Sequence, residues 1–135
     1  SLANMVRELQ PDAKLYFHQT WAYEIDSNHS GFVNYNNDQV EMYNRIKQTT
    51  EMAAKSIHAT LIPVGEAIQT LRETVPEFGG LSLCRDGFHL SLDYGRYAAA
   101  ATWLHIIIGE KINAADFEDF NPELLKKIID VVNEL

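Results

Sequence analysis

The chain has 135 residues, a length typical of a single domain, and its 46% hydrophobic and 22% charged residues are typical of a globular protein rather than a disordered one. The formal net charge of -8 argues against nucleic acid as a partner, because phosphate binding requires clustered Lys and Arg. The sequence has no polybasic segment that would bind an anionic membrane, and its only cysteine, Cys84, excludes an intrachain disulfide and a cysteine-based zinc site.

Helical and strand patterns alternate along the chain. Apolar residues recur at helical spacing from Leu2 to Leu9, whereas residues 14–21 are rich in aromatic side chains and predict a strand. In chain order, the sequence predicts a helix over 2–9, a strand over 14–21, a polar loop over 22–37, a helix over 38–55, a strand over 57–64, a helix over 65–75, a loop over 77–90, a long and mostly buried helix over about 92–108, and a last helix that opens at residue 121.

Capping and breaking residues mark the ends of the predicted helices. Asp38 is the expected N-cap of the second helix, and Pro76 stops the third. Gly109 ends the long apolar helix. Asn121 and Pro122 open the last helix as its N-cap and first-turn residue. These signals support the five predicted helices.

The alternation of strands and helices predicts an α/β architecture, with residues 1–135 forming a single domain. Crossover connections of this kind are right-handed and give a parallel sheet with helices on both faces. Only two strands are clear, however, and a parallel sheet is normally larger. The unpaired N–H and C=O groups at the edge of a sheet can form hydrogen bonds with another strand. We therefore expect the chain to supply part of a larger domain, with the missing N-terminal half or a second copy covering the exposed edge.

Residues 86–89, Asp-Gly-Phe-His, form the most informative motif of the chain. An Asp three residues before a His can hold the imidazole in one tautomer, so that the other ring nitrogen acts as a base. The same spacing occurs at Asp26 and His29, but these residues lie in the polar loop, where an Asx turn is the simpler explanation. Asp86 and His89 are therefore the candidate catalytic residues.

Trp21 and His29 are the candidate substrate-binding residues. Ligands of open parallel sheets bind at the carboxyl ends of the strands, which is where the loop after Trp21 is expected. Loops at such positions often contact substrates. Trp21 is either a stacking platform for a sugar or a core residue, because an indole suits both environments.

Two other kinds of site receive less support. Cys84 lies five residues before His89, so a cysteine nucleophile is conceivable, but a lone cysteine in an apolar setting is more often a small buried residue. His18, Asp26 and His29 could ligate a metal, yet their spacing matches no recognised metal motif. We therefore expect neither a metal nor another cofactor.

The residues after the Asp-His motif complete a longer pattern: Leu90 and Ser91 follow at once, then Gly95 and an alanine-rich helix from Tyr97. This pattern resembles the last block of the SGNH (GDSL-type) hydrolase superfamily, and the resemblance extends over about residues 14–109. The stretches that carry it are, in order, WAYEIDSNHSGF, MYN, IPVGEAIQTLR and RDGFHLS.

The resemblance implies a serine esterase with a three-layer, flavodoxin-like fold. His89 would be the general base and Asp86 would orient it, while a Ser attacks a small acyl ester, such as an O-acetyl group on a carbohydrate. The Gly-Asp-Ser block that carries this nucleophile in the superfamily does not occur in the 135 residues. The chain is therefore expected to be the C-terminal part of such a domain, inactive by itself, in a periplasmic or secreted protein.

The chain departs from the superfamily pattern at the residues that would bind the oxyanion. Asn37 and Asp38 look like the end of a Gly-x-Asn-Asp block, but Tyr35 stands where Gly is expected, so we assign Asn37 no such role. A second class of function is therefore kept: a non-catalytic module that binds a ligand or carbohydrate through the Trp21 loop on an esterase-like scaffold. A Gly-Asp-Ser block upstream would favour the enzyme.

Overall fold

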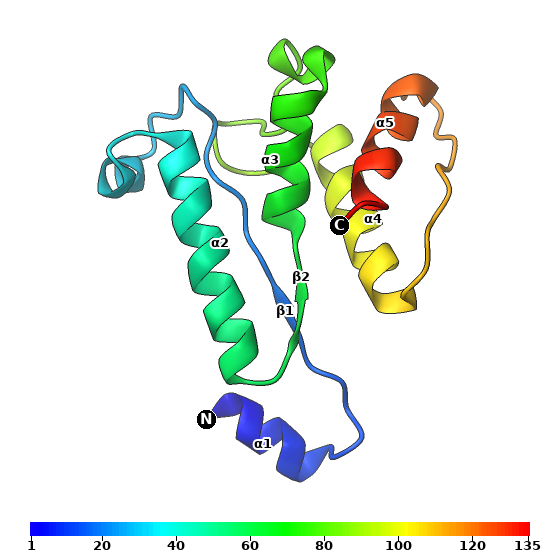
Figure 1. Cartoon of the computed structure of the whole chain (residues 1–135). Helices are drawn as coiled ribbons and strands as arrows, with labels where there is room; N and C mark the ends of the chain where they lie inside the picture. The colour runs from blue at the N-terminus through cyan, green and yellow to red at the C-terminus, as the bar shows by residue number, and fades with distance from the viewer.

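Two short parallel strands, β1 (Tyr16–His18) and β2 (Thr60–Ile62), lie at the centre of the computed structural model, which describes residues 1–135 (Figure 1). Phe17 of β1 lies opposite Leu61 of β2. The helix that connects them, α2 (Gln39–Ser56), contacts both strands. The other elements are α1 (Leu2–Leu9), the 3-10 helix η1 (Ser30–Tyr35), α3 (Val64–Thr74), the 3-10 helix η2 (Pro76–Gly79), α4 (Tyr94–Ile108) and α5 (Pro122–Val132).

The predicted α/β class with parallel strands is confirmed, but both strands are shorter than predicted. Before β2 the chain turns at His58, whose φ of 50° is incompatible with a strand. After β2, Pro63 precedes the first residue of α3, Val64, so that the predicted end of the strand is already helical. The predicted helix caps Asp38 and Asn121 are confirmed, because each side chain accepts a hydrogen bond from a backbone N–H of its helix.

The main core surrounds α3, which lies between α2 and the pair formed by α4 and α5 (Figure 1). Ile68 and Leu71 of α3 are fully buried. On α4 the buried positions include Ala98 and Ala101, and these small side chains let α3 and α4 approach closely. This packing fixes the segment between α3 and α4, which carries the Asp-His motif.

The start of α3 packs against the chain that leaves β1. A Cβ atom on Gly65 would lie 2.0 Å from the backbone oxygen of Thr20, so only glycine fits there. The fully buried Gln19 side chain accepts a hydrogen bond from Glu66 N–H at 2.8 Å and donates one to Thr50 Oγ1 at 3.0 Å. These contacts fix the point at which the polar loop leaves the sheet.

The last turns of α4 are exposed, which corrects the prediction of a mostly buried helix. Leu104, Ile107 and Ile108 are each about half exposed. The buried positions of α4 lie on the face towards the main core, whereas Trp103 contacts His18 of β1. The apolar residues Leu2 and Leu9 of α1 are exposed as well. None of the helices is both long and apolar enough to cross a membrane.

Candidate functional site

Asp86 and His89, the predicted catalytic pair, are in direct contact. His89 Nδ1 lies 2.6 Å from Asp86 Oδ2. Asp86 Oδ1 accepts hydrogen bonds from the backbone N–H groups of His89, at 2.7 Å, and Phe88, at 3.2 Å. The His89 side chain is 55% exposed and the Asp86 side chain 40%. The pair is therefore accessible to a second molecule or to another part of a longer chain.

The hydrogen bonds to Asp86 favour its ionised form. The hydrogen bond from His89 is the largest cause of a pKa lowered from 3.8 to about 2, and the backbone N–H groups add to it. A carboxylate only accepts hydrogen bonds, so the bridging proton belongs to His89 Nδ1. Neutral His89 then has an unprotonated Nε2, which makes no hydrogen bond within the chain and can accept a proton.

The pair lies on a tight hairpin, residues 83–91, called the site hairpin from here on. Cys84 and Leu90 form an antiparallel bridge across it. Gly87, near its tip, has a φ of 89°, which residues with a side chain rarely adopt. A Cβ atom on Gly87 would also lie 3.1 Å from Ser27 Oγ. The tip therefore requires glycine both for its backbone conformation and for its contact with the polar loop.

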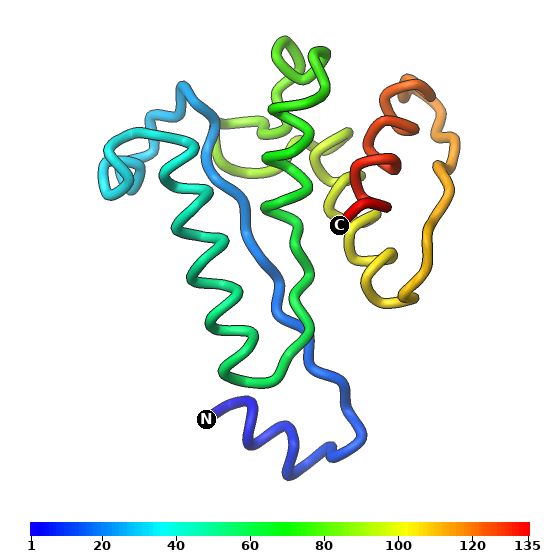
Figure 2. Tube along the Cα trace, in the orientation of Figure 1, coloured from blue at the N-terminus to red at the C-terminus, as the bar shows by residue number.

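The site hairpin runs beside the polar loop that follows β1 (Figure 2). Trp21 donates its indole N–H to Phe88 C=O at 2.7 Å. Glu24 donates its backbone N–H to Gly87 C=O at 2.8 Å. The two segments thus form one unit beyond the carboxyl end of β1, where sequence reasoning placed the loop after Trp21.

Trp21 and His29, the predicted substrate-binding residues, both contact Phe88, the neighbour of His89. Trp21 is half-buried and packs against the main core. The His29 ring lies 4.7 Å from the Phe88 ring. His29 Nδ1 accepts a hydrogen bond from Gly31 N–H at 3.0 Å, so neutral His29 carries its proton on Nε2 as a donor. The structure brings both residues to the site hairpin, and their role in substrate binding stays a prediction.

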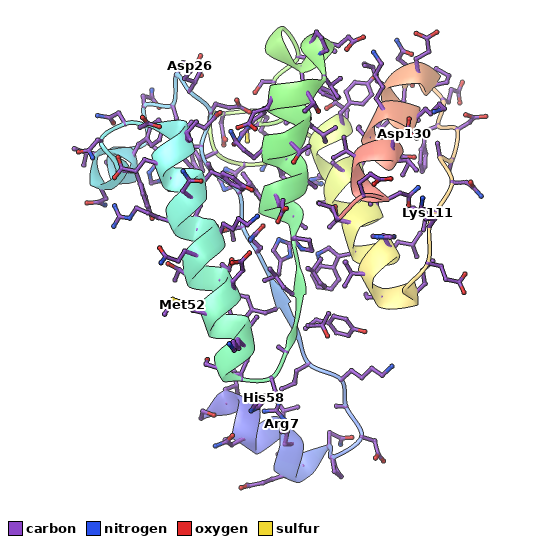
Figure 3. All side chains as sticks on the ribbon, viewed as in Figure 1. Arg7, Asp26, Met52, His58, Lys111 and Asp130 are labelled. Atoms are coloured by element: carbon purple, nitrogen blue, oxygen red, sulfur yellow. The ribbon has the colours of Figure 1, made fainter.

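Asp26 and His29 repeat the Asp-His spacing but do not form a second pair. His29 Nδ1 is occupied by Gly31 N–H, and the Asp26 side chain makes no hydrogen bond. Asp26 lies at the outer end of the polar loop, at the opposite end of the molecule from Arg7 and His58 (Figure 3). The local backbone, rather than the spacing alone, decides which Asp and His meet.

Cys84 is a buried thiol without nucleophilic character. Burial is the main cause that raises its pKa to about 12, and the nearby Arg72 only partly opposes this shift. The thiol is therefore protonated at neutral pH, whereas the nucleophilic form is the thiolate. This agrees with the interpretation of Cys84 as a small core residue.

His18 lies apart from Asp26 and His29, with which it could have formed a metal site. Its Nδ1 accepts the indole N–H of Trp103 at 3.0 Å, and burial lowers its pKa. The structure gathers no group of three or more His, Cys, Asp or Glu side chains that could hold a metal ion.

Sequence reasoning missed a buried ion pair behind the site hairpin. Arg72 Nη2 lies 2.9 Å from Glu24 Oε1, and the two side chains are only 7% and 14% exposed. Nothing in the sequence pairs them, because Arg72 occupies a helix of mixed polarity and Glu24 a polar loop, and both settings normally face water.

A polar cavity of about 340 Å³ opens beside Asp86, between the polar loop and the site hairpin. Only one of its nine lining residues is hydrophobic. The lining residues are Glu24, Asp26, Ser27, Asn28, Ser82, Cys84, Arg85, Asp86 and Gly87.

We expect the Asp86 carboxyl group to titrate with a midpoint of about 2, and the His89→Ala variant to return it towards 3.8. Because the folded-state pKa lies below the ordinary value, the pair stabilises the site hairpin above about pH 3.8, and this stabilisation is lost as the pH falls through about 2. Carboxyl ¹³C shifts measured by NMR would follow the titration. A wild-type midpoint near 3.8 would show that the hydrogen bond to His89 does not persist in solution.

In comparisons with known proteins, the sequence of the chain matches one family. The family described as "Domain of unknown function (DUF4886)" matches residues 2–128. The crystal structure of a DUF4886 family protein from Bacteroides uniformis is 36% identical, with a TM-score of 0.89 over 98% of this chain and 52% of that chain. The present chain thus spans about half the length of this similar structure. A search of curated proteins found no match.

Proposed function

This chain belongs to the DUF4886 family, and we propose that it forms the C-terminal part of a serine esterase of the SGNH type. The observation that carries this proposal is the Asp86–His89 pair, which joins an ionised carboxylate to an imidazole with a free Nε2 at the exposed tip of the site hairpin. The same arrangement of Asp and His activates the nucleophile in serine hydrolases on unrelated folds.

In the proposed mechanism, His89 takes up a proton and gives it away again in each of two half-reactions. Its Nε2 takes the proton of a Ser Oγ supplied from outside this chain, while Oγ bonds to the ester carbonyl carbon. The imidazolium then gives that proton to the departing alcohol as the ester C–O bond breaks and an acyl-enzyme remains. In the second half-reaction, water gives a proton to Nε2 while its oxygen bonds to the acyl carbon. The bond between the acyl carbon and Ser Oγ then breaks, Oγ takes the proton from the imidazolium, and the acid is released. Asp86 stays ionised throughout and stabilises the imidazolium, for which its low pKa is suited.

The nucleophile and the remaining strands would come from the rest of a longer protein. Each strand of the two-stranded sheet has an unpaired edge, and apolar residues of α1 and α4 are exposed near the sheet. The similar crystal structure is about twice as long as this chain. We propose that the additional half completes a three-layer, flavodoxin-like domain and covers these surfaces, in preference to a second copy of the chain.

The proposed substrate is a small acyl ester of a hydroxylated molecule, such as a carbohydrate O-acetyl ester. The polar cavity beside Asp86 supports a hydroxyl-rich alcohol, because its side chains offer both donors and acceptors of hydrogen bonds. Trp21 and His29 do not line this cavity; beside Phe88, the Nε2–H of His29 would donate to another part of the substrate, and the half-buried Trp21 ring would contact it.

We expect a fluorophosphonate probe to label a serine of the longer protein outside this chain. The probe forms a stable bond only with a serine activated by a base, so labelling reports the complete triad. Mass spectrometry of the digested protein would locate the adduct, and the Asp86→Asn protein would serve as the control that loses it. A folded, full-length protein without any adduct would overturn the esterase proposal.

The polar cavity also favours a second candidate, a non-catalytic module that binds a carbohydrate. Such a module would bind a hydroxylated ligand without turnover and without a labelled serine. Calorimetric binding of an unesterified oligosaccharide by a protein that resists the probe would select this function over the esterase.

A further inference from the structure

The ion pair between Glu24 and Arg72 lies directly behind the site hairpin, and the mechanism above does not use it. Its charged atoms are 2.9 Å apart and its side chains are almost fully buried. Burying two charges removes their hydration, and this cost can exceed the attraction between them. A gain in folding stability therefore does not explain the pair. The contacts that the pair makes indicate what it does.

Glu24 holds the site hairpin at two points. Its Oε1 accepts the backbone N–H of Cys84 at 3.1 Å, on the first strand of the hairpin. Its own backbone N–H donates to Gly87 C=O at 2.8 Å, near the tip. Residues 84 and 87 enclose Asp86, so one residue fixes the chain on both sides of the catalytic carboxylate.

Arg72 in turn fixes Glu24 from a rigid helix. Its Nη2 donates to the Glu24 carboxylate, and its Nη1 donates to Ala22 C=O at 2.9 Å and contacts Gln69 Oε1 at 3.4 Å. The guanidinium thus holds both a side chain and the backbone of the polar loop. Because α3 lies at the centre of the main core and is held by it, these hydrogen bonds fix the position of the polar loop.

We propose that Glu24, held by Arg72, is a positioning residue for the Asp86–His89 pair. The Asp86 carboxylate is oriented by the backbone N–H groups of the hairpin tip, and Glu24 fixes that backbone. A neutral side chain at position 24 would leave the Arg72 charge buried without a counter-ion and loosen the hairpin. The effect on turnover rests on the proposed function, whereas the effect on the geometry of the pair does not.

The test is the Glu24→Gln variant of the longer protein, with Glu66→Gln as the matched control. Glu66 also pairs with a cation, Lys47, at 3.3 Å, and its carboxylate does not touch the site hairpin. Long-range ¹H–¹⁵N NMR would measure the fraction of neutral His89 that is protonated on Nδ1. We expect Glu24→Gln to lower this fraction and to reduce kcat about 100-fold, because misplacement by about 1 Å has effects of this size. Glu66→Gln should change neither.

A double variant separates positioning from a general loss of structure. If Glu24 acts through the pair, Glu24→Gln should cost little further turnover when Asp86→Asn is already present. Full additivity of the two losses, or a wild-type tautomer in folded Glu24→Gln, would overturn the inference. If Glu24→Gln does not fold, Glu24→Asp tests the same contact, since it keeps the charge beside Arg72 and withdraws the carboxylate from Cys84 N–H. A wild-type protein without esterase activity would defeat the proposed function, while the tautomer measurement would still decide the positioning role.

Discussion

Replacing His89 with Ala in the longer protein is expected to lower ester turnover by at least about 10⁴-fold. In the proposed mechanism this variant loses the group that takes the serine proton, and a serine hydroxyl is a weak nucleophile at neutral pH. The fold should be retained, because the His89 side chain is 55% exposed and belongs to no core cluster. Steady-state hydrolysis of an activated acetyl ester would measure the loss, with circular dichroism to verify folding.

The matched control for this variant is His105→Ala. His105 also uses its Nδ1 for a local hydrogen bond, to Glu110 C=O at 2.7 Å, but it lies at the far end of α4. Its removal should leave turnover within about twofold of the wild type. Turnover by His89→Ala within tenfold of the wild type would remove His89 from the mechanism. A larger loss from Asp26→Asn than from Asp86→Asn would show that the wrong Asp had been assigned.

Gly65→Ala is expected to destabilise the chain by about 3 kcal/mol or more. The new Cβ atom would lie 2.0 Å from the backbone oxygen of Thr20 and 3.1 Å from Gln19 Oε1. The closer of these atoms belongs to the backbone and cannot rotate away, so β1 and α3 would have to separate. Urea unfolding followed by circular dichroism would report a lower midpoint, and the Tm should fall by roughly 10 °C.

Gly79→Ala provides the control for this effect. A Cβ atom on Gly79 meets no heavy atom within 4 Å, so its stability should change by no more than about 0.5 kcal/mol. Equal stabilities of Gly65→Ala and Gly79→Ala would mean that the close approach of α3 to the end of β1 does not exist in solution.

The contacts that the sequence predicts here are local ones. Asp86 and His89 lie three residues apart around a glycine that accepts a positive φ, so their meeting depends on little beyond the hairpin itself. The helix caps Asp38 and Asn121 are local in the same sense. The spacing alone was not sufficient, since Asp26 and His29 share it, yet His29 accepts a hydrogen bond from Gly31 N–H and Asp26 makes none.

The features that escaped prediction depend on residues far apart in the chain. Glu24 and Arg72 are separated by 48 positions, and each looks like an ordinary surface charge in its own segment. The exposed turns of α4 escaped for a similar reason, because an apolar helix is expected to be buried without any indication of what buries it. The three-layer architecture also stays a proposal, because it depends on strands outside this chain.

The chain has two tryptophans, whose rings both contact His18, at 6.2 Å for Trp21 and 5.5 Å for Trp103, and they give it built-in optical probes. Trp21 donates its indole N–H to Phe88 C=O on the site hairpin, whereas Trp103 donates to His18 beside the exposed face of α4. A single-tryptophan protein that keeps Trp21 would report movements of the hairpin through its emission. One that keeps Trp103 would report any molecule or segment that covers α4, and comparison of the two proteins would distinguish such an event from motion of the hairpin without a chemical label.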